Sequence, residues 1–417
     1  MAAAFSYFLG KSAKIAETPA EILDSGWKYA KMKTSAFGRV PVFLMTDTEK
    51  VLTMKKVVTF GEIMIRVAPE GFLRFAQAMP GKVHTMFSGA EANVAVSVAL
   101  LGGEAKYVTA LPKHAIADAC VATLRGLGVD TTSIVRTDAG RLGIFFLESG
   151  ANQRPSNVVY DREYSSIALT PADDYDWDAV FAGCDWFHVT GITPALSKTA
   201  ADATLRAVQE AKKRGLTVSS DLNFRKKLWK WDASCTNREL AKRTMTQVLP
   251  YVDVLIANES DCADVLGIRA DNSDAELGKL DTARYPDVAR KVVKAFPNIQ
   301  KVGITLRESH SATHNSWGGV LYDAACDQAF FAPLNPDGEY QPYEIKSIVD
   351  RVGGGDSFAA GLIFALTSDD LSDPQTAIRF AAASSCLAHS IYGDYNYSSA
   401  AEVKTLMNGN GSGRVQR

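Results

Sequence analysis

The sequence contains few cysteines, and they are not clustered. Its six cysteines lie far apart, with no C-x-x-C pair among them. A zinc site built from thiolates needs clustered cysteines, and a secreted disulfide scaffold needs a high density of them. The spacing argues against both classes, so we expect reduced, mostly buried thiols in a cytoplasmic protein. The cysteines are Cys120, Cys184, Cys235, Cys262, Cys326 and Cys386.

The sequence also lacks long apolar runs and an excess of charge of either sign. No run approaches the ~18 apolar residues that a membrane-spanning helix requires. The 45 basic and 47 acidic residues leave a net charge of −2, so we expect neither nucleic acid nor an anionic membrane as a partner. With 47% of residues apolar and 22% charged, the chain can bury a large core. A diffusible small molecule is the expected partner.

The first 53 residues do not fit the pattern of the rest. Charged residues from Lys11 onward interrupt any signal-peptide core. Gly10-Lys11-Ser12 resembles the end of a phosphate-binding P-loop, but Phe5 stands where that motif needs a glycine, and no strand precedes it. Met54 lies directly before the first strong strand. We therefore predict an N-terminal extension of unknown role at 1–53, one domain at 54–407 and a flexible tail at 408–417.

The domain alternates between apolar strand patterns and amphipathic helix patterns. Alternation of this kind is typical of a parallel sheet with helices on both faces. The strands are predicted near 56–60, 107–110, 187–189, 216–220, 252–256 and 301–305, and the helices near 91–102, 115–127, 197–214, 259–266, 285–296, 356–367, 374–391 and 398–407. Segments within 80–90 and 141–163 show strand patterns without helices. We expect them to form a small antiparallel sheet that stands off the main domain.

A glycine-rich turn followed by an aspartate is the most informative motif. Gly353, Gly354 and Gly355 precede Asp356 and a helix of small residues. The first amides of a helix have no partner within the helix and attract anions, and glycines let phosphate oxygens approach the backbone. A carboxylate beside such a cradle can accept a proton from an attacking hydroxyl. By itself, the pattern also fits a tight turn in which Asp356 caps a helix.

Two spaced motifs resemble those of the ribokinase-like (PfkB) carbohydrate kinases. The C-terminal signature of that family, D-T-x-G-A-G-D, stands here as Asp350-Arg351-Val352-Gly353-Gly354-Gly355-Asp356. The N-terminal signature stands as Ser88-Gly89-Ala90-Glu91-Ala92-Asn93, with Ser88 in place of a glycine. The resemblance, which runs from about Lys55 to Met407, implies a three-layer α/β/α sandwich with a small β-sheet lid. It also implies ATP and Mg²⁺ as cofactors, Asp356 as the catalytic base and the three glycines as an anion hole.

Further motifs resemble one branch of this family, the 2-keto-3-deoxygluconate kinases. They include 61–64, 190–196 and 221–229. The branch must hold a substrate carboxylate, to which a planar arginine is well suited. The resemblance therefore implies phosphorylation of a sugar acid. Alternatives are another sugar kinase, acting on a neutral ketose or a related deoxy-keto acid, and a sensor without turnover. The implied substrate residues are Gly89, Asn93, Phe145, Tyr160, Arg162, Ile192 and Arg225, and for Arg225 a surface salt bridge is the alternative.

The resemblance places the nucleotide near two further segments. Asn258 and Asp261 match the run that arranges magnesium beside the phosphates, although Asn258 also fits a helix N-cap. Thr305 and Arg307 match a contact at a strand end. His310 and His314, in contrast, lie in a segment that reads as a loop without a nearby third ligand, so we predict no dedicated metal site held by protein groups.

Exposed strands of the small sheet leave an edge to be covered. We therefore expect the chain to form a homo-oligomer through these lid strands.

Overall fold

The computed structural model describes residues 55–270, 282 and 284–411. The predicted extension at 1–53 lies outside the described residues, and so do residues 412–417 of the predicted tail.

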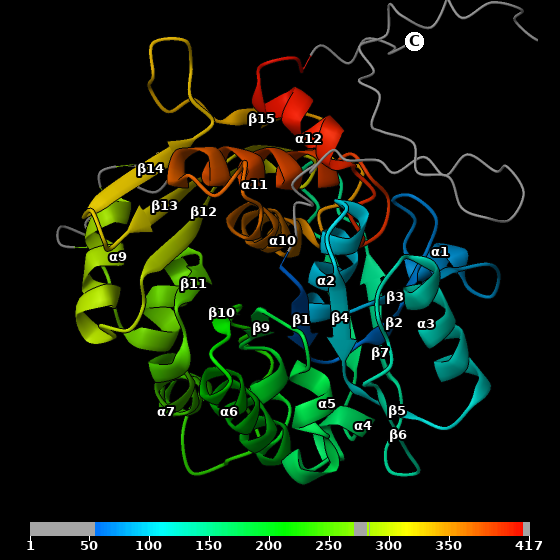
Figure 1. Cartoon of the computed structure of the whole chain (residues 1–417). Helices are drawn as coiled ribbons and strands as arrows, with labels where there is room; N and C mark the ends of the chain where they lie inside the picture. Colours follow the sequence, from blue (N-terminus) through cyan, green and yellow to red (C-terminus); the bar gives the residue numbers. More distant parts are fainter. Residues whose placement is uncertain (1–54, 271–281, 283, 412–417) are drawn as a thin grey trace, which may run out of the picture. The chain divides into compact units, whose positions relative to one another are not determined.

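A nine-stranded sheet forms the centre of this domain (Figure 1). Its strand order is β14-β13-β12-β11-β10-β9-β1-β4, with β15 paired to β13. The strands from β4 to β12 run parallel, whereas β13, β14 and β15 are antiparallel to their neighbours. The bounds are β1 Val57–Phe60, β4 Ala105–Val108, β9 Trp186–Thr190, β10 Thr217–Asp221, β11 Val254–Ala257, β12 Lys301–Ser311, β13 His314–Asp323, β14 Gln328–Ala332 and β15 Tyr343–Ile345. A short parallel pair, β5 Ala110–Pro112 and β6 Val135–Thr137, lies outside it.

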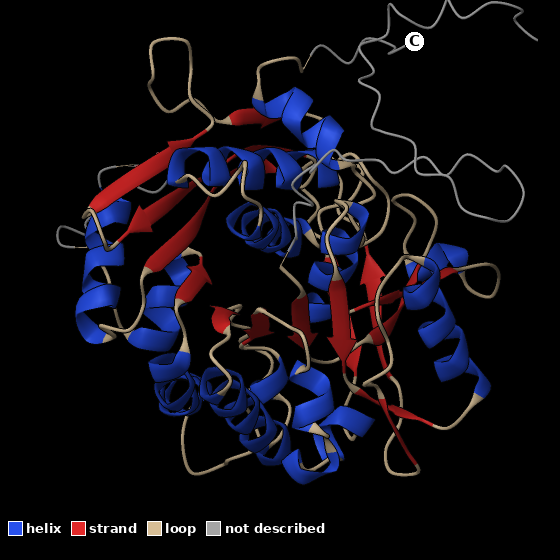
Figure 2. Cartoon of the chain, viewed as in Figure 1, coloured by secondary structure: helices blue, strands red, loops and turns tan. Residues whose placement is uncertain are grey.

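Helices cover both faces of the sheet (Figure 2). Successive strand residues point to opposite faces, so Val57 belongs to one apolar core and Val58 to the other. The core around Val58 includes α5 Trp177–Phe181, α6 Lys198–Lys213, α7 Asn237–Val248 and α9 Arg284–Ala295. The core around Val57 includes α2 Ala90–Leu100, α3 Ala115–Gly126, α10 Gly354–Thr367, α11 Pro374–Ala388 and α12 Ala400–Met407. The predicted three-layer α/β/α fold is confirmed.

Most of the longer helices begin at a side chain that caps the first turn. Ser197 accepts a hydrogen bond from the amide of Ala200, and Thr236 with Glu239 forms a reciprocal capping box. Helix α10 differs, because Gly353 precedes it in a left-handed conformation and provides no side-chain cap. Its first amides are therefore open to a ligand.

A separate four-stranded sheet, which we call the small sheet, has the order β3-β2-β7-β8. The predicted segments supply β3 His84–Ser88, β7 Gly143–Glu148 and β8 Asn157–Asp161. The sequence interpretation missed β2, Met64–Ala68, which follows β1 after only three residues. It was also wrong to expect a purely antiparallel sheet, because β2 and β7 pair in parallel. Among the short helices, α1 Phe75–Ala78 follows β2 and α4 Ser166–Leu169 follows β8.

The expectation of a loop around His310 and His314 was wrong. Strand β12 continues to Ser311 and β13 begins at His314, so the two histidines flank a tight turn between long antiparallel strands. Glu344 of β15 lies beside them and is the third potential ligand that the sequence interpretation did not find. The predicted helix near 259–266 is short and irregular, with α8 at Glu259–Asp261 and a π-helical turn at Cys262–Leu266.

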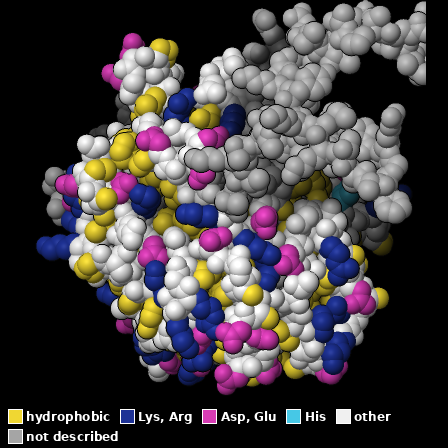
Figure 3. All heavy atoms as spheres, in the orientation of Figure 1, with side chains coloured by type: hydrophobic (Ala, Val, Ile, Leu, Met, Phe, Trp, Pro, Cys, Tyr) yellow, Lys and Arg dark blue, Asp and Glu magenta, His cyan; other side chains and the backbone are white. Residues whose placement is uncertain are grey.

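Among the described residues that Figure 3 leaves visible, acidic and basic side chains are mixed and form no large patch of one sign. This distribution agrees with the nearly balanced charge of the sequence. Within the described part of the chain, no helix has both the length and the apolar character needed to cross a membrane.

Candidate active site

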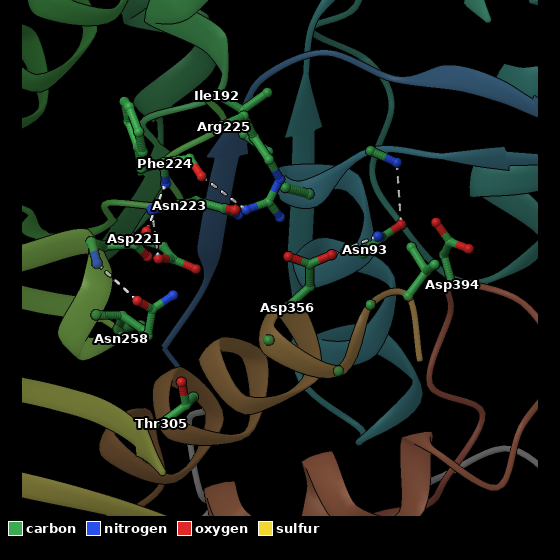
Figure 4. A pocket seen from close by; sticks show the side chains of 18 of the residues that line it. Asn93, Ile192, Asp221, Asn223, Phe224, Arg225, Asn258, Thr305, Asp356 and Asp394 are labelled. Carbon is green, nitrogen blue, oxygen red and sulfur yellow. Dashed lines mark hydrogen bonds between the residues drawn. The ribbon is translucent and has the colours of Figure 1, made fainter. Parts of the chain in front are cut away.

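A cleft of ≈710 Å³ opens between the main sheet, the start of α10 and the small sheet. The carboxyl ends of β9, β10 and β11 border it, which is where parallel sheets bind ligands. All the site residues predicted from the sequence line this one cleft: Gly89, Asn93, Phe145, Tyr160, Arg162, Ile192, Arg225, Asn258, Asp261, Thr305, Arg307, Gly353, Gly354, Gly355 and Asp356. Figure 4 shows how several of them converge.

The turn before α10 needs a glycine at Gly353. Its φ of +81° is a left-handed conformation that most side chains resist. A Cβ atom added to Gly353 would also lie 2.3 Å from the carbonyl oxygen of Asp394. The chain can therefore make this turn only without a side chain there, and the turn presents the first amides of α10 to the cleft.

Asp356 projects from the first turn of α10 toward Asn93, which comes from α2 (Figure 4). The Asn93 Nδ2 group donates a hydrogen bond to Asp356 Oδ2 at 2.7 Å, and Asn93 Oδ1 accepts one from the amide of Gly89 at 3.3 Å. The two sequence motifs thus meet, and Asn93 orients the carboxylate. Burial raises the pKa of Asp356 to about 6, against the opposing effects of Asn93 and Arg225. Such a carboxylate is suited to accept a proton near neutral pH.

Arg225 lies on the loop that follows β10 and reaches toward the cleft (Figure 4). Asn223 in this loop has a φ of +38°, a conformation that asparagine tolerates better than most residues. The guanidinium donates a weak hydrogen bond to its neighbour, the carbonyl oxygen of Phe224, at 3.4 Å. Within the described residues, Arg225 forms no ion pair. An anion entering the cleft can therefore bind it.

Two buried carboxylates stand near Arg225 on the sheet side of the cleft. Desolvation and the neighbouring Asp261 and Asp356 raise the pKa of Asp221 well above its usual range, and desolvation raises that of Asp261 to about 6. Asn258 Oδ1 accepts a hydrogen bond from the Asp261 amide at 2.8 Å, so the capping role considered for Asn258 is present. Carboxylates crowded in this way favour a bound cation, and oxygen ligands fit Mg²⁺.

Arg162 has a partner that the sequence interpretation did not identify. Its guanidinium binds the buried carboxylate of Glu62, with Nε donating to Oε2 at 2.8 Å. The guanidinium carbon also lies 5.2 Å from the centre of the Tyr160 ring, and Phe145 stands beside that ring. Glu62 therefore fixes Arg162 in the wall of the cleft and offsets its charge, which leaves Arg225 as the more available cation.

The β12–β13 hairpin and the neighbouring Arg351 add two further cations to the cleft. Thr305, Arg307 and Trp317 line the cleft from the same face of these strands. Desolvation lowers the pKa of Arg307, and the positive charges of Arg351 and Arg225 lower it further. Arg351, which stands where the family has threonine, donates a hydrogen bond to Asn315 Oδ1 on β13 at 3.1 Å. This end of the cleft therefore favours negatively charged groups.

Beside the glycine turn lies a buried ionic cluster whose cation, Arg66, no sequence motif indicated. Arg66, from β2 of the small sheet, is fully buried and binds the carboxylates of Asp350 and Asp394. Asp394 also accepts a hydrogen bond from the hydroxyl of Ser88. Asp350 Oδ1 accepts hydrogen bonds from the amides of Arg351 at 2.8 Å and Val352 at 3.2 Å. Arg66 therefore ties the small sheet to the turn that carries the catalytic candidates.

Comparisons with known proteins agree with this architecture. The family model described as pfkB family carbohydrate kinase matches residues 54–294. A 2-dehydro-3-deoxygalactonokinase from Haloferax volcanii is 30% identical, and the match covers 86% of this chain and 98% of the relative. A 2-dehydro-3-deoxygluconokinase from Thermoproteus tenax is 27% identical over 83% of this chain and 92% of the relative.

A similar solved structure matches a larger part of the chain than the family model does. The 2-dehydro-3-deoxygluconokinase from Thermotoga maritima is 42% identical, with a TM-score of 0.75, and the match covers 85% of this chain and 100% of that one. The family model spans more than half of the chain, so the predicted family and enzyme class are confirmed: this chain belongs to the pfkB family of carbohydrate kinases.

Proposed function

We propose that this carbohydrate kinase transfers the γ-phosphoryl group of ATP to the terminal hydroxyl of 2-keto-3-deoxygluconate. The product is 2-keto-3-deoxy-6-phosphogluconate. The observation that carries the sugar-acid assignment is Arg225, a cation in the cleft that forms no ion pair within the described residues. The names of the relatives from T. tenax and T. maritima support the same substrate, since 2-dehydro and 2-keto denote the same group.

The substrate carboxylate binds between the loop after β10 and the small sheet. Arg225 supplies a planar pair of donors, and Arg162 adds those of its donors that Glu62 does not occupy. Tyr160 and Phe145 form the adjoining aromatic wall. The backbones of Gly89 and Ile192 and the side chain of Asn93 complete the sugar-binding part of the cleft.

Asp356 acts as the general base. Asn93 occupies Oδ2 and leaves Oδ1 to accept the proton of the terminal hydroxyl. The hydroxyl oxygen forms a bond to the γ-phosphorus while the bond between that phosphorus and the bridging oxygen of ADP breaks. The amides at Gly353, Gly354 and Gly355 stabilise the charge on the transferring group.

The phosphates of ATP lie against the start of α10 and the β12–β13 hairpin. Thr305 and Arg307 contact them there, and the neighbouring charge of Arg351 adds to the attraction. Asn258 and Asp261 are the residues that would hold Mg²⁺ and its waters. When bound, Mg²⁺ neutralises charge that develops on the phosphate oxygens.

The H. volcanii relative supports a second candidate substrate, 2-keto-3-deoxygalactonate, through its name. This acid presents the same carboxylate and terminal hydroxyl, so Arg225 and Asp356 would serve both acids equally. A neutral ketose has no carboxylate to bind Arg225, which forms no ion pair within the described residues. A sensor without turnover needs no carboxylate base oriented by Asn93.

A substrate panel in an ATP-coupled assay tests the proposal. The panel contains both deoxy-keto acids, a neutral ketose and a neutral aldose. For the wild-type enzyme, the highest kcat/KM of the panel should be that for one of the two acids. Arg225→Ala should lose about 100-fold or more on that acid, because a charge-assisted bidentate contact contributes about 3 kcal/mol. Lys230→Ala is the matched control, since Lys230 is an exposed cation of the same loop that does not line the cleft.

The outcomes separate the candidates. If Arg225→Ala lowers activity on a neutral sugar as much as on an acid, Arg225 does not recognise a carboxylate. If the purified protein binds the acid and ATP tightly without turnover, the sensor alternative holds instead of the kinase proposal.

The small sheet also carries the proposed oligomer contact. Its outer strands β3 and β8 each have one unpaired edge within the described residues, and Val159 on β8 is 54% exposed. Pairing between copies would cover these edges.

A further inference from the structure

A cluster of two histidines and a glutamate lies on the β12–β13 hairpin and β15. One ligand atom from each of His310, His314 and Glu344 lies within 4.8 Å of the other two. His314 Nε2 is 2.9 Å from Glu344 Oε2, and the two imidazole rings lie 4.5 Å apart between centres. Three potential metal ligands therefore lie close together on the hairpin and β15.

The pairing of the strands places these side chains on one face. Glu344 lies opposite Ser316 in the β13–β15 ladder, and His314 stands two residues from Ser316, so His314 shares the face of that pair. Arg307 and Trp317 form the next cross-strand pair, one residue from Ser316 along β13, so their side chains point to the other face, where they line the cleft. The cluster thus lies on the face of the hairpin opposite the active-site cleft and is a separate site.

Ser316 holds two of the three ligands, His310 and Glu344, in place. Its hydroxyl lies 2.7 Å from His310 Nε2 and donates a hydrogen bond to Glu344 Oε1 at 2.7 Å. Partners of this kind orient ligating groups and raise the affinity of a metal site.

We propose that His310, His314 and Glu344 form a site for Zn²⁺, with water completing the coordination. Two imidazole nitrogens and one carboxylate oxygen form a ligand set typical of zinc with an open position. Mg²⁺ prefers oxygen ligands and keeps its waters, so the ion that accompanies ATP does not compete well here. The ligand set, rather than overall charge, selects the metal.

The turn of the hairpin beside the cluster is hydrogen-bonded to two other parts of the domain. The Ala312 amide donates a hydrogen bond to the Asn152 carbonyl at 2.7 Å, and the Ile348 amide donates one to the Thr313 carbonyl at 3.0 Å. These contacts join the turn of the hairpin to the β7–β8 connection of the small sheet and to the segment that leads into Asp350. Zn²⁺ bound across β12, β13 and β15 would stabilise this junction.

Zinc binding by the full chain, measured against a chromogenic chelator after EDTA treatment, tests the proposal. A Cys326→Ser background removes the exposed thiol, which could bind zinc itself. We expect one Zn²⁺ per chain with micromolar or tighter affinity, unaffected by millimolar Mg²⁺. His310→Ala, His314→Ala and Glu344→Gln should each weaken it about tenfold or more. His84→Ala is the control, because His84 contacts Tyr392, far from the hairpin in sequence.

Co²⁺ provides a second measurement, since its absorption spectrum reports the coordination of the site. A spectrum with nitrogen and oxygen ligands in tetrahedral or five-coordinate geometry supports the proposal. The proposal is overturned if the Cys326→Ser protein binds no zinc in the micromolar range, or if the three ligand variants bind it as tightly as the background. Neither measurement uses substrate or ATP, so the outcome is independent of the proposed kinase reaction.

Discussion

Replacing Arg66 with methionine should strongly destabilise the protein, because it leaves two buried carboxylates without their cation. The side chains of Arg66, Asp350 and Asp394 are 0–3% exposed. Desolvation already raises the pKa of Asp394, and the attraction of Arg66 opposes that rise. Removing one partner of a buried ion pair typically costs about 3–5 kcal/mol. We therefore expect a loss of this size in the free energy of unfolding.

Urea denaturation followed by circular dichroism measures the effect. Arg141→Met is the control, because Arg141, like Arg66, binds carboxylate oxygens through both terminal nitrogens, but Arg141 and its partner Asp161 are both more than a third exposed. The control should change the unfolding midpoint little. Adding Asp394→Asn to Arg66→Met should recover part of the loss, because it removes one uncompensated charge. If Arg66→Met destabilises no more than Arg141→Met, the buried cluster does not stabilise the fold as argued.

Two further predictions concern the active site, and a third concerns the small sheet. The kcat/KM of the free enzyme should fall below pH 6 and be about tenfold lower at pH 5. Burial raises the pKa of Asp356 to about 6, and the protonated carboxyl group cannot accept a proton. A flat profile of kcat/KM from pH 5 to 8 would contradict this. Gly353→Ala should lower kcat about 100-fold, since a Cβ displaces the turn, whereas Gly126→Ala, with open space around its Cβ, should not. Val159→Lys should convert an oligomer to a monomer in light scattering, and an unchanged mass rules out the β8 contact.

Much of the fold could be predicted from the sequence because its signals are local. The alternation of buried strands with amphipathic helices located the strands of the parallel sheet and most of the helices that cover it. The glycine turn and Asn93 were also recognisable locally, and the structure brings them together through one hydrogen bond, from Asn93 to Asp356. The roles predicted for these residues in catalysis and binding remain proposals.

Features that depend on partners far away in the sequence could not be predicted in the same way. Arg66 lies 284 residues from Asp350 and 328 from Asp394, and it sits in the short strand β2, which the sequence interpretation missed. Glu62 lies 100 residues from Arg162. A charged residue in a strand pattern gives no sign of whether it is exposed or paired in the interior.

The β12–β13 hairpin also depends on pairing that the local sequence does not indicate. Polar residues from Ser309 to Ser316 suggested a loop, yet these residues continue β12 and begin β13. Strand pairing with β15 overrides the low apolar content there and brings Glu344 to His314. Only the cross-strand register, which no local pattern specifies, reveals the cluster.

Asp356→Asn tests the central proposal most directly. Asparagine keeps the size of the side chain and can still contact Asn93, but its amide cannot accept the proton of the attacking hydroxyl. Calorimetry should show that the variant binds ATP and 2-keto-3-deoxygluconate within a few-fold of wild type. Its kcat should fall about 100- to 10,000-fold, the usual contribution of a general base. A variant that retains wild-type kcat on the acid would contradict the assignment of Asp356 as the base.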